Sequence, residues 1–385
     1  MDSLKDLFLL DSDIVFLNHG SFGATPRPVF DVYQEWQRLF ERQPVAFVDQ
    51  EMPAYFETAR KELGAYINAP ARDVVYVPNV TFAVNLVAHS LLLGPGDEIL
   101  TTDHEYGACD RTWQFLAQKK GFEVIRRPLS LPVLSPEAML EELWQGVSYH
   151  TRIIFLSHIT SFTAQHFPVE MVCRRAREAG ILTLIDGAHA PGQITLDMLA
   201  IGADFYAGNC HKWLCGPKGS AFLYTRPERQ ALIEPLIVSW GWGENNTLSY
   251  GSQYLDYIQW WGTLDPAAYL SIPAAIQFQK DYHWPAVRQR CHELLLQAIE
   301  RICILTGQPS FYSPDAPLFH QMAIAPLPAT VDNLALKNQL YGRFKIEIPC
   351  LNWGGRPHIR LSVQGYNTQE DLDTLIKALE ILLPK

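Results

Sequence analysis

Short apolar runs alternate with amphipathic segments along most of the chain. The runs contain β-branched residues, are typical of buried strands, and occupy residues 74–77, 98–102, 122–126, 152–156, 181–185, 204–207 and 220–224. Apolar residues at helical spacing separate several of these runs, after residue 81 as far as 93, and over 136–145, 168–179 and 196–202. The alternation predicts an α/β fold built on an open sheet.

Helical patterns dominate both ends of the chain. Residues 26–42 and 51–67 predict amphipathic helices, whereas 236–255 predict a loop. Beyond residue 260 the pattern predicts helices over 266–279, 285–305, 331–341 and 368–383, and strands over 320–324, 345–348 and 358–362. Thr368 is the expected N-cap of the last helix. We therefore predict a large domain over 26–260, and a smaller α+β domain formed by 1–25 and 261–385.

Composition limits the classes of protein that fit. The 385 residues are 48% apolar and 19% charged, which allows a large core, and no apolar run approaches the roughly 18 residues of a membrane span. The N-terminal segment carries acids and lacks the long apolar stretch of a secretory signal. The net charge of -10 argues against nucleic acid as the main partner. Seven cysteines without metal-ligand spacing fit a reducing cytoplasm, and we predict no metal site.

Residues 181–218 carry the most informative chemistry. The run 181–185 ends in Asp186, and the run 204–207 is followed by Asn209, His211 and Lys212. In an open α/β sheet, the carboxyl ends of the strands are where ligands bind. Pyridoxal phosphate needs a lysine for a Schiff base and a carboxylate beside its pyridine nitrogen, so Lys212 and Asp186 suit it. Lys218 is a rival lysine, but it lies in a turn beyond the strand end.

Each of these residues also has an ordinary interpretation. A lone lysine is usually a solvated surface residue, and an aspartate after a strand is usually a turn or N-cap residue. The pairing of Asp186 with Lys212 on adjacent strand ends favours the cofactor site, but residue chemistry alone leaves both interpretations open.

The strings Asp186-Gly187-Ala188-His189 and His211-Lys212-Trp213 resemble the class V aminotransferase family of fold-type I pyridoxal-phosphate enzymes. Within the family, the isopenicillin N epimerase-like branch is the most similar. The resemblance extends from the segment Leu17-Asn18-His19-Gly20-Ser21-Phe22-Gly23 to Arg360-Leu361-Ser362 and beyond. It implies a large domain with a mostly parallel seven-stranded sheet, a smaller α+β C-terminal domain, and pyridoxal 5'-phosphate as the cofactor.

The resemblance also implies how the cofactor is held. Segment 79–85 looks like the phosphate-binding turn of the family, in which Val80 and Thr81 contact the phosphate at a helix N-terminus. Asn209 and His211 are expected to reach the same phosphate. Either His104 or Tyr106 is expected to stack on the ring, and the family position favours Tyr106. His189 is expected to hydrogen-bond the ring hydroxyl oxygen, and Ser161 stands where many relatives have an asparagine.

Three further assignments concern the substrate and the partner subunit. Arg360 lies within a predicted strand, where a structural ion pair is the ordinary interpretation; by family position it binds the α-carboxylate of an amino acid. Asn18 and His19 are expected near the substrate. Gly262 and Thr263 match a family segment that reaches the partner subunit's phosphate, which implies a homodimer with shared active sites.

The reaction type is less well defined. The resemblance implies chemistry at Cα with Lys212 as the base, most like that of an epimerase, with a lyase or an aminotransferase as the alternative. Cysteine desulfurases carry a nucleophilic cysteine on a long mobile loop, and Cys350 follows the predicted strand 345–348 too closely for such a loop. A protein that binds the cofactor without catalysis, and a dehydrogenase, are rivals; the dehydrogenase is disfavoured because no G-x-G-x-x-G turn follows a first strand.

Overall fold

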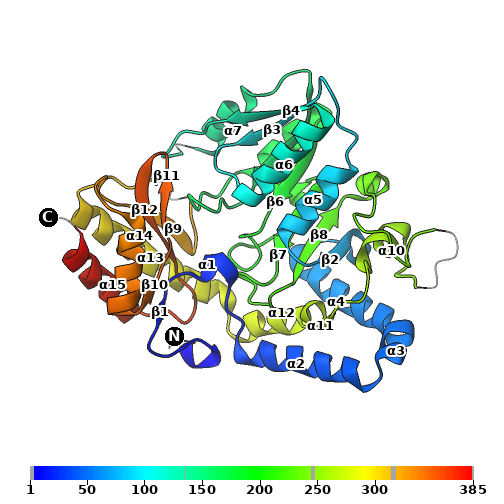
Figure 1. The fold of residues 1–385 in the computed structure, drawn as a ribbon, viewed down its shortest axis with the longest axis horizontal. Helices are drawn as coiled ribbons and strands as arrows, with labels where there is room; N and C mark the ends of the chain where they lie inside the picture. Colours follow the sequence, from blue (N-terminus) through cyan, green and yellow to red (C-terminus); the bar gives the residue numbers. More distant parts are fainter. Residues whose placement is uncertain (1–3, 134, 244–247, 314–317, 384–385) are drawn as a thin grey trace.

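A mixed sheet forms the centre of the large domain (Figure 1). The computed structural model describes residues 4–133, 135–243, 248–313 and 318–383, and within these ranges the sheet has seven strands in the order β2-β8-β7-β6-β5-β3-β4. They are β2 (Val74–Val77), β3 (Glu98–Thr102), β4 (Glu123–Arg127), β5 (Thr151–Ser157), β6 (Leu182–Asp186), β7 (Phe205–Asn209) and β8 (Ala221–Thr225). β3 to β7 pair in parallel, and β8 runs antiparallel to both of its neighbours. The predicted α/β fold is confirmed.

Helices cover the sheet, which explains why β2, β7 and β8 are buried along their whole length. The α-helices between residues 27 and 281 are α2 (Arg27–Arg42), α3 (Pro44–Ala46), α4 (Met52–Ile67), α5 (Val80–Ser90), α6 (Gly107–Lys120), α7 (Pro136–Trp144), α8 (Val169–Glu178), α9 (Met198–Ile201), α10 (Gln253–Gln259), α11 (Ala267–Leu270) and α12 (Ile272–Asp281). Side-chain caps begin several of them: Asn79 accepts from the amide of Phe82 in α5, and Ser135 accepts from that of Ala138 in α7.

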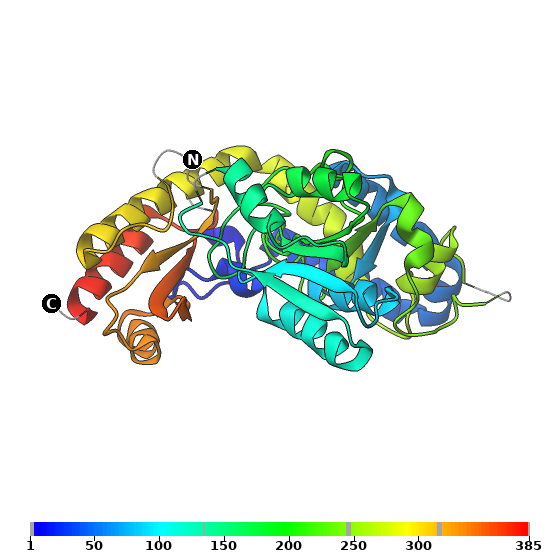
Figure 2. The ribbon, with the colours of Figure 1, turned by 90° about the horizontal axis from the view of Figure 1, so that it is seen from above.

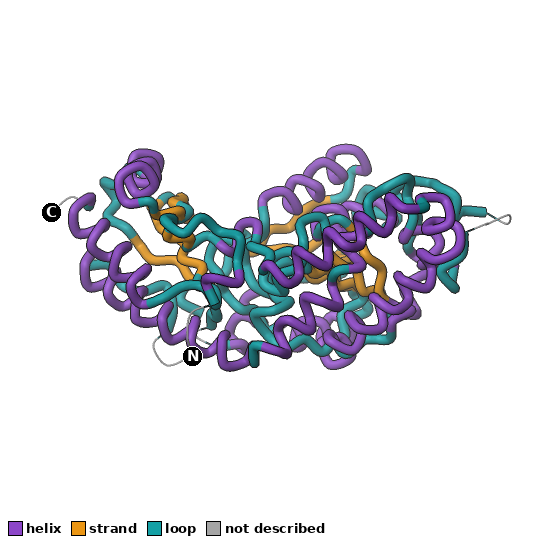
Figure 3. The backbone as a smooth tube through the Cα atoms, turned by 90° about the horizontal axis from the view of Figure 1, so that it is seen from below, coloured by secondary structure: helices purple, strands orange, loops and turns teal. Residues whose placement is uncertain are grey.

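The C-terminal part forms a second, smaller sheet beside the long helix α13 (Trp284–Thr306). It contains β9 (Met322–Pro326), β11 (Cys350–Trp353) and β12 (Arg356–Ser362) in the order β11-β12-β9, with α14 (Asn333–Phe344) and α15 (Gln369–Leu382). The expected cap of α15 is confirmed, because Thr368 and Asp371 form a capping box. Figure 2 shows this part at one end of an elongated molecule, and Figure 3 shows that its strands lie apart from the large sheet.

The N-terminal segment joins the C-terminal part although the two are far apart in sequence. β1 (Val15–Phe16) pairs in parallel with β10 (Ile346–Glu347), and the amide of Ser362 donates to the carbonyl of Leu17. These contacts support the grouping of residues 1–25 with the smaller domain. The boundary near residue 261 stays a prediction, since α11 and α12 still contact α2 and α4.

Four local expectations were wrong. Helix α6 follows β3 without having been predicted, and α10 lies partly within the expected loop 236–255. Strand β11 was also missed, and the predicted loop around Ser21 contains the short helix α1 (His19–Phe22). Each is short, or polar for its length, so that its stability comes from tertiary packing more than from its own sequence pattern.

Candidate active site

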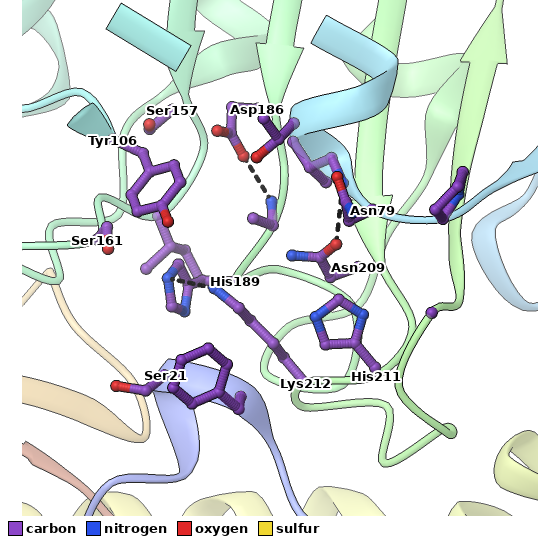
Figure 4. A pocket seen from close by; sticks show the side chains of 17 residues that line it. Ser21, Asn79, Tyr106, Ser157, Ser161, Asp186, His189, Asn209, His211 and Lys212 are labelled. Atoms are coloured by element: carbon purple, nitrogen blue, oxygen red, sulfur yellow. Dashed lines mark hydrogen bonds between the residues drawn. The ribbon is translucent and has the colours of Figure 1, made fainter. Parts of the chain in front are cut away.

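A pocket opens at the carboxyl edge of the parallel strands (Figure 4). β5, β6 and β7 end there in Ser157, Asp186 and Asn209, and all three residues line the pocket. The turn before α5, the loop after β3 and the helix α1 complete the wall. The parallel pairing therefore brings together side chains that are up to about 190 residues apart in sequence, as Ser21 and Lys212 are.

Asp186 is buried at the end of β6. Its Oδ1 accepts from the amide of Ala188 over 2.8 Å, and the thiol of Cys109 lies 3.6 Å from Oδ2. Burial raises the pKa of Asp186, while the Ala188 amide and the nearby Lys212 lower it. The next residue must be glycine, because a Cβ on Gly187 would lie 2.3 Å from the ring of Tyr206. Asp186 is thus an anion that a cation in the pocket would stabilise.

Lys212 and His189 meet at the opposite end of the pocket. Trp213 Nε1 donates to His189 Nδ1 over 3.2 Å, and since an indole is only a donor, Nδ1 is the unprotonated nitrogen. Burial holds the pKa of His189 well below its usual range, so the neutral ring carries its proton on Nε2, 3.2 Å from Lys212 Nζ. Burial, together with the charge of Arg360, also lowers the pKa of Lys212 to about 8. The Lys212 amine therefore loses its proton more readily than that of an ordinary lysine.

The N-terminus of α5 forms another wall of the pocket. The amide of Val80 donates to Asn209 Oδ1 over 3.1 Å, and that of Phe82 is capped by Asn79, whereas Thr81 lines the pocket. His211 lines it too, and its Nδ1 donates to the carbonyl of Ser220 over 3.0 Å. The N-terminus of a helix suits an anion. Asn209 accepts from the Val80 amide, while Val80 itself lines the pocket, so the expected contact of Val80 with the phosphate stays a prediction.

Arg360 on β12 contacts two residues that line the pocket, although it is not itself among the lining residues. Its guanidinium donates to the backbone oxygen of Ser161 over 2.5 Å and to Ser21 Oγ over 3.0 Å. Burial lowers its pKa to about 10, and its Nε has no hydrogen-bond partner. Within the described ranges no carboxylate forms an ion pair with Arg360, which argues against the structural alternative. Ser161 and Ser21 hold a guanidinium that retains capacity for a carboxylate.

Tyr106 and His104 were competing candidates for the stacking position, and the structure separates them. Tyr106 lines the pocket with its ring directed inward (Figure 4). His104 is fully buried elsewhere, with Nδ1 2.9 Å from Thr163 Oγ1 and Nε2 3.2 Å from the carbonyl of Leu129. Its two ring nitrogens are therefore used within the protein, and the expectation for His104 is corrected in favour of Tyr106.

Comparisons with known proteins agree with this geometry. The family described as Aminotransferase class-V matches residues 23–375. Isopenicillin N epimerase of Amycolatopsis lactamdurans is 35% identical over 97% of this chain and 96% of its own length. The chain belongs to the class V aminotransferase family. A putative L-cysteine desulfhydrase 1 of Oryza sativa subsp. japonica is 28% identical over 97% of this chain and 84% of its own length. The cysteine desulfurase CsdA of Escherichia coli shares the fold, with a TM-score of 0.83 at 23% identity, covering 98% of this chain and 96% of that one.

This class V aminotransferase is an enzyme that uses pyridoxal 5'-phosphate. The pocket fits the cofactor on physical grounds as well. It offers an acid at one end, a lysine with a lowered pKa at another, and the N-terminus of α5 with Thr81 for a phosphate. No helix among the described residues of the enzyme is long and apolar enough to cross a membrane.

His19 and Asn18 lie behind the pocket wall and do not line it. His19 is fully buried, with Nδ1 3.0 Å from the hydroxyl of Tyr366 and Nε2 3.0 Å from the carbonyl of Lys212. Asn18 accepts from Ser21 Oγ over 2.5 Å. The expected substrate contacts are therefore corrected: His19 supports the backbone of Lys212, and Asn18 acts through Ser21.

Gly262 and Thr263 do not line the pocket of their own chain, and Thr263 is exposed. Their expected role in a partner subunit stays a prediction. Cys350 begins β11 and pairs with Ile359, so it is held in a sheet far from a mobile loop, as its position in the sequence predicted.

Three residues of the site carried no assigned role in the sequence analysis. Ser21 lies within the segment 17–23 that resembles the family, and Trp213 follows Lys212 directly. Ser157 ends β5 as Asp186 ends β6. A polar residue directly after an apolar strand is the signal that would have found Ser157.

Proposed function

We propose that this enzyme removes the Cα proton of an amino-acid substrate, and that its reaction is an epimerisation. The observation that supports this most directly is the pairing of Lys212 with neutral His189 in the pocket. Beside it, Arg360 forms no ion pair with a carboxylate of the described ranges and contacts Ser21 and Ser161 of the pocket wall. The 35% identity to isopenicillin N epimerase over nearly the whole chain favours this reaction over the others of the family.

In this proposal, each residue has one physical task. Arg360, held by Ser21 and Ser161, binds the substrate carboxylate and sets the orientation of Cα. Lys212 Nζ, in its deprotonated form, accepts the Cα proton, and burial makes this form more accessible by lowering the pKa to about 8. His189 Nε2 lies 3.2 Å from this amine.

The cofactor, when bound, supplies an electron sink for the negative charge left at Cα. Asp186 would stabilise positive charge on the ring nitrogen, and His189 Nε2 would hydrogen-bond the ring oxygen in place of the Lys212 amine. Thr81, Asn209 and His211 would hold the phosphate, and Tyr106 would stack on the ring.

Epimerisation also needs a proton donor on the opposite face of Cα. Tyr106, His104 and His19 are candidates for this donor, but His104 and His19 lie outside the pocket, which leaves Tyr106. A ring that stacks on the cofactor is poorly placed for this task. β-Elimination, which needs only one base, is therefore the second candidate, and the similarity to a putative cysteine desulfhydrase favours it specifically.

Solvent exchange tests the shared step and then divides the two reactions. The holoenzyme is incubated in D₂O with a panel of L- and D-amino acids that includes cysteine and its thioethers. Deuterium at Cα with inversion supports epimerisation, and a 2-oxo acid with ammonia supports elimination. No exchange with any amino acid, in an enzyme with fully bound cofactor, would refute chemistry at Cα.

We further infer a homodimer, since Gly262 and Thr263 match a family segment that serves the partner's site and Thr263 is exposed. We also infer a cytoplasmic location. All seven cysteines lie in the described ranges, and none forms a disulfide, which fits a reducing compartment.

A further inference from the structure

Glu105 is a second carboxyl group beneath the ring end of the pocket. It lies in the loop after β3 and is buried, with an exposed fraction of 6%. Thr102 Oγ1 donates to its Oε1 over 2.7 Å, and Ser157 Oγ lies 2.5 Å from its Oε2. Ser157 itself lines the pocket and is paired in register with Asp186 on the neighbouring strand. Glu105 is thus linked to the pocket that takes the cofactor through the hydroxyl group of Ser157.

The surroundings of Glu105 do not compensate a negative charge. Within the described ranges it forms no ion pair, and no lysine or arginine is among the groups that act on it electrostatically. Its polar contacts are two side-chain hydroxyls and the Ser157 backbone, and the nearby charge is that of Asp186, which repels it. A buried carboxylate without a cation costs several kcal/mol, so such a group takes up a proton.

Asp186 has the opposite environment. A backbone amide donates to its Oδ1, and Lys212 acts on it as a positive charge. When two carboxyl groups lie close together, the one with the better donors keeps the charge and the other keeps the proton. The geometry therefore divides the roles between the two acids.

A neutral Glu105 carries its proton on one of two oxygens, and each oxygen faces a hydroxyl group. The Thr102 hydroxyl accepts from the amide of His104 over 3.1 Å and donates to Glu105 Oε1. This leaves Oε2, 2.5 Å from Ser157 Oγ, as the oxygen that would carry the proton. A proton on Oε2 would be donated to Ser157 Oγ and would free the Ser157 hydrogen for the pocket.

We propose that Glu105 is a positioning residue for the cofactor: a buried neutral acid that orients the Ser157 hydroxyl and leaves Asp186 as the lone anion at the ring end of the pocket. The proposal rests on the cofactor and not on the reaction, and it adds a positioning group to the ring-nitrogen side of the site.

Infrared difference spectroscopy of the apoprotein tests the protonation state without cofactor or substrate. Burial and the charge of Asp186 raise the pKa of Glu105 to about 8. We expect the C=O band of a protonated acid below that pH, its loss as the pH rises through about 8, and its absence from Glu105→Gln. The band should persist in Asp186→Asn, and in Glu123→Gln as the matched control, because Glu123 is exposed on β4. A band that survives in Glu105→Gln, or that disappears in Asp186→Asn, would overturn the assignment.

Cofactor titration tests the positioning role. Glutamine reproduces the neutral hydrogen bonds, so Glu105→Gln should change the cofactor Kd at pH 7 by no more than about threefold. Glu105→Ala and Ser157→Ala should each weaken binding by about tenfold. The double variant should weaken it by little more than either, because the two substitutions interrupt the same chain of contacts.

A tenfold loss in Glu105→Gln would mean that the residue acts as an anion. Fully additive losses would mean that Glu105 does not act through Ser157. Failure of Cα exchange with every amino acid would leave both results valid.

Discussion

At the scale of single residues, burial and pairing determine what each side chain can do. Lys212 is the clearest example, because a buried amine near Arg360 has its pKa lowered to about 8 from 10.5. In the window between these values, the unfolded chain binds a proton that the native apoprotein does not, so this residue contributes stability that increases with pH there. Below that window the buried charge is a cost to folding.

Replacing Lys212 with methionine should therefore stabilise the apoprotein at pH 7 by about 1–3 kcal/mol, and the gain should vanish as the pH rises above about 10. Denaturant unfolding across this pH range measures the effect. Lys218→Met provides the matched control, because Lys218 is exposed in a turn. An equal gain in both variants would show that the effect is general and not due to the site.

Borohydride reduction of the holoenzyme followed by peptide mapping should find the pyridoxyl group on Lys212. The expected reason is the lowered pKa of its amine and its place beside His189. Modification of Lys218 in its place would contradict the assignment of the cofactor lysine.

Arg360→Ala should lower kcat/KM for amino acids, which corresponds to a loss of about 2–4 kcal/mol of transition-state stabilisation, because one charge-assisted contact with the carboxylate is lost. The cofactor Kd should remain nearly unchanged. Arg356→Ala on the same strand is the control, since Arg356 is exposed. If Arg360→Ala retains the kcat/KM of the native enzyme, the guanidinium is structural.

At the scale of elements, the sequence predicted the strands and the longer helices well, because their apolar runs are continuous or follow a helical period. It did not predict α6, whose first turn Gly107-Ala108-Cys109-Asp110 gives no apolar stripe, or β11, which is half exposed. For the site, Asp186 was proposed from its place at the end of a predicted strand, Lys212 from its place shortly after the next one, and Arg360 from the family resemblance; their roles stay predictions. The positions of His19 and His104 could not be predicted, because the sequence does not show whether a buried ring faces the pocket or packs behind the residues that line it.

The first turn of α5 allows capping and ligand binding to be tested separately. Thr81→Val should weaken cofactor binding by about tenfold, since it removes a hydroxyl at the phosphate end, and should leave the free energy of unfolding nearly unchanged. Asn79→Ala should instead cost about 1 kcal/mol of unfolding free energy through loss of the Phe82 cap. Isothermal titration and denaturant unfolding measure the two effects, and a Thr81→Val variant with native affinity would remove Thr81 from the phosphate site.

At the scale of the whole molecule, the proposed dimer predicts that two different inactive variants restore each other. Lys212→Ala and Thr263→Ala chains, unfolded together and refolded, should regain part of the activity, because one site of the mixed dimer has both residues intact. Sedimentation of the native enzyme should show a dimer. A monomer with native cofactor affinity, or a mixture without any recovered activity, would contradict shared sites.

The N-terminal segment around His19 is held by residues from the far end of the chain. Leu17 contacts Ser362, and His19 contacts Tyr366 and the carbonyl of Lys212. Gly23 has a φ of 72°, and any Cβ there would lie 1.9 Å from the carbonyl oxygen of His211. Ser21 contacts Arg360 across 339 positions of sequence. A chain whose synthesis has not yet reached Arg360 therefore lacks one of the side chains that form the proposed substrate end.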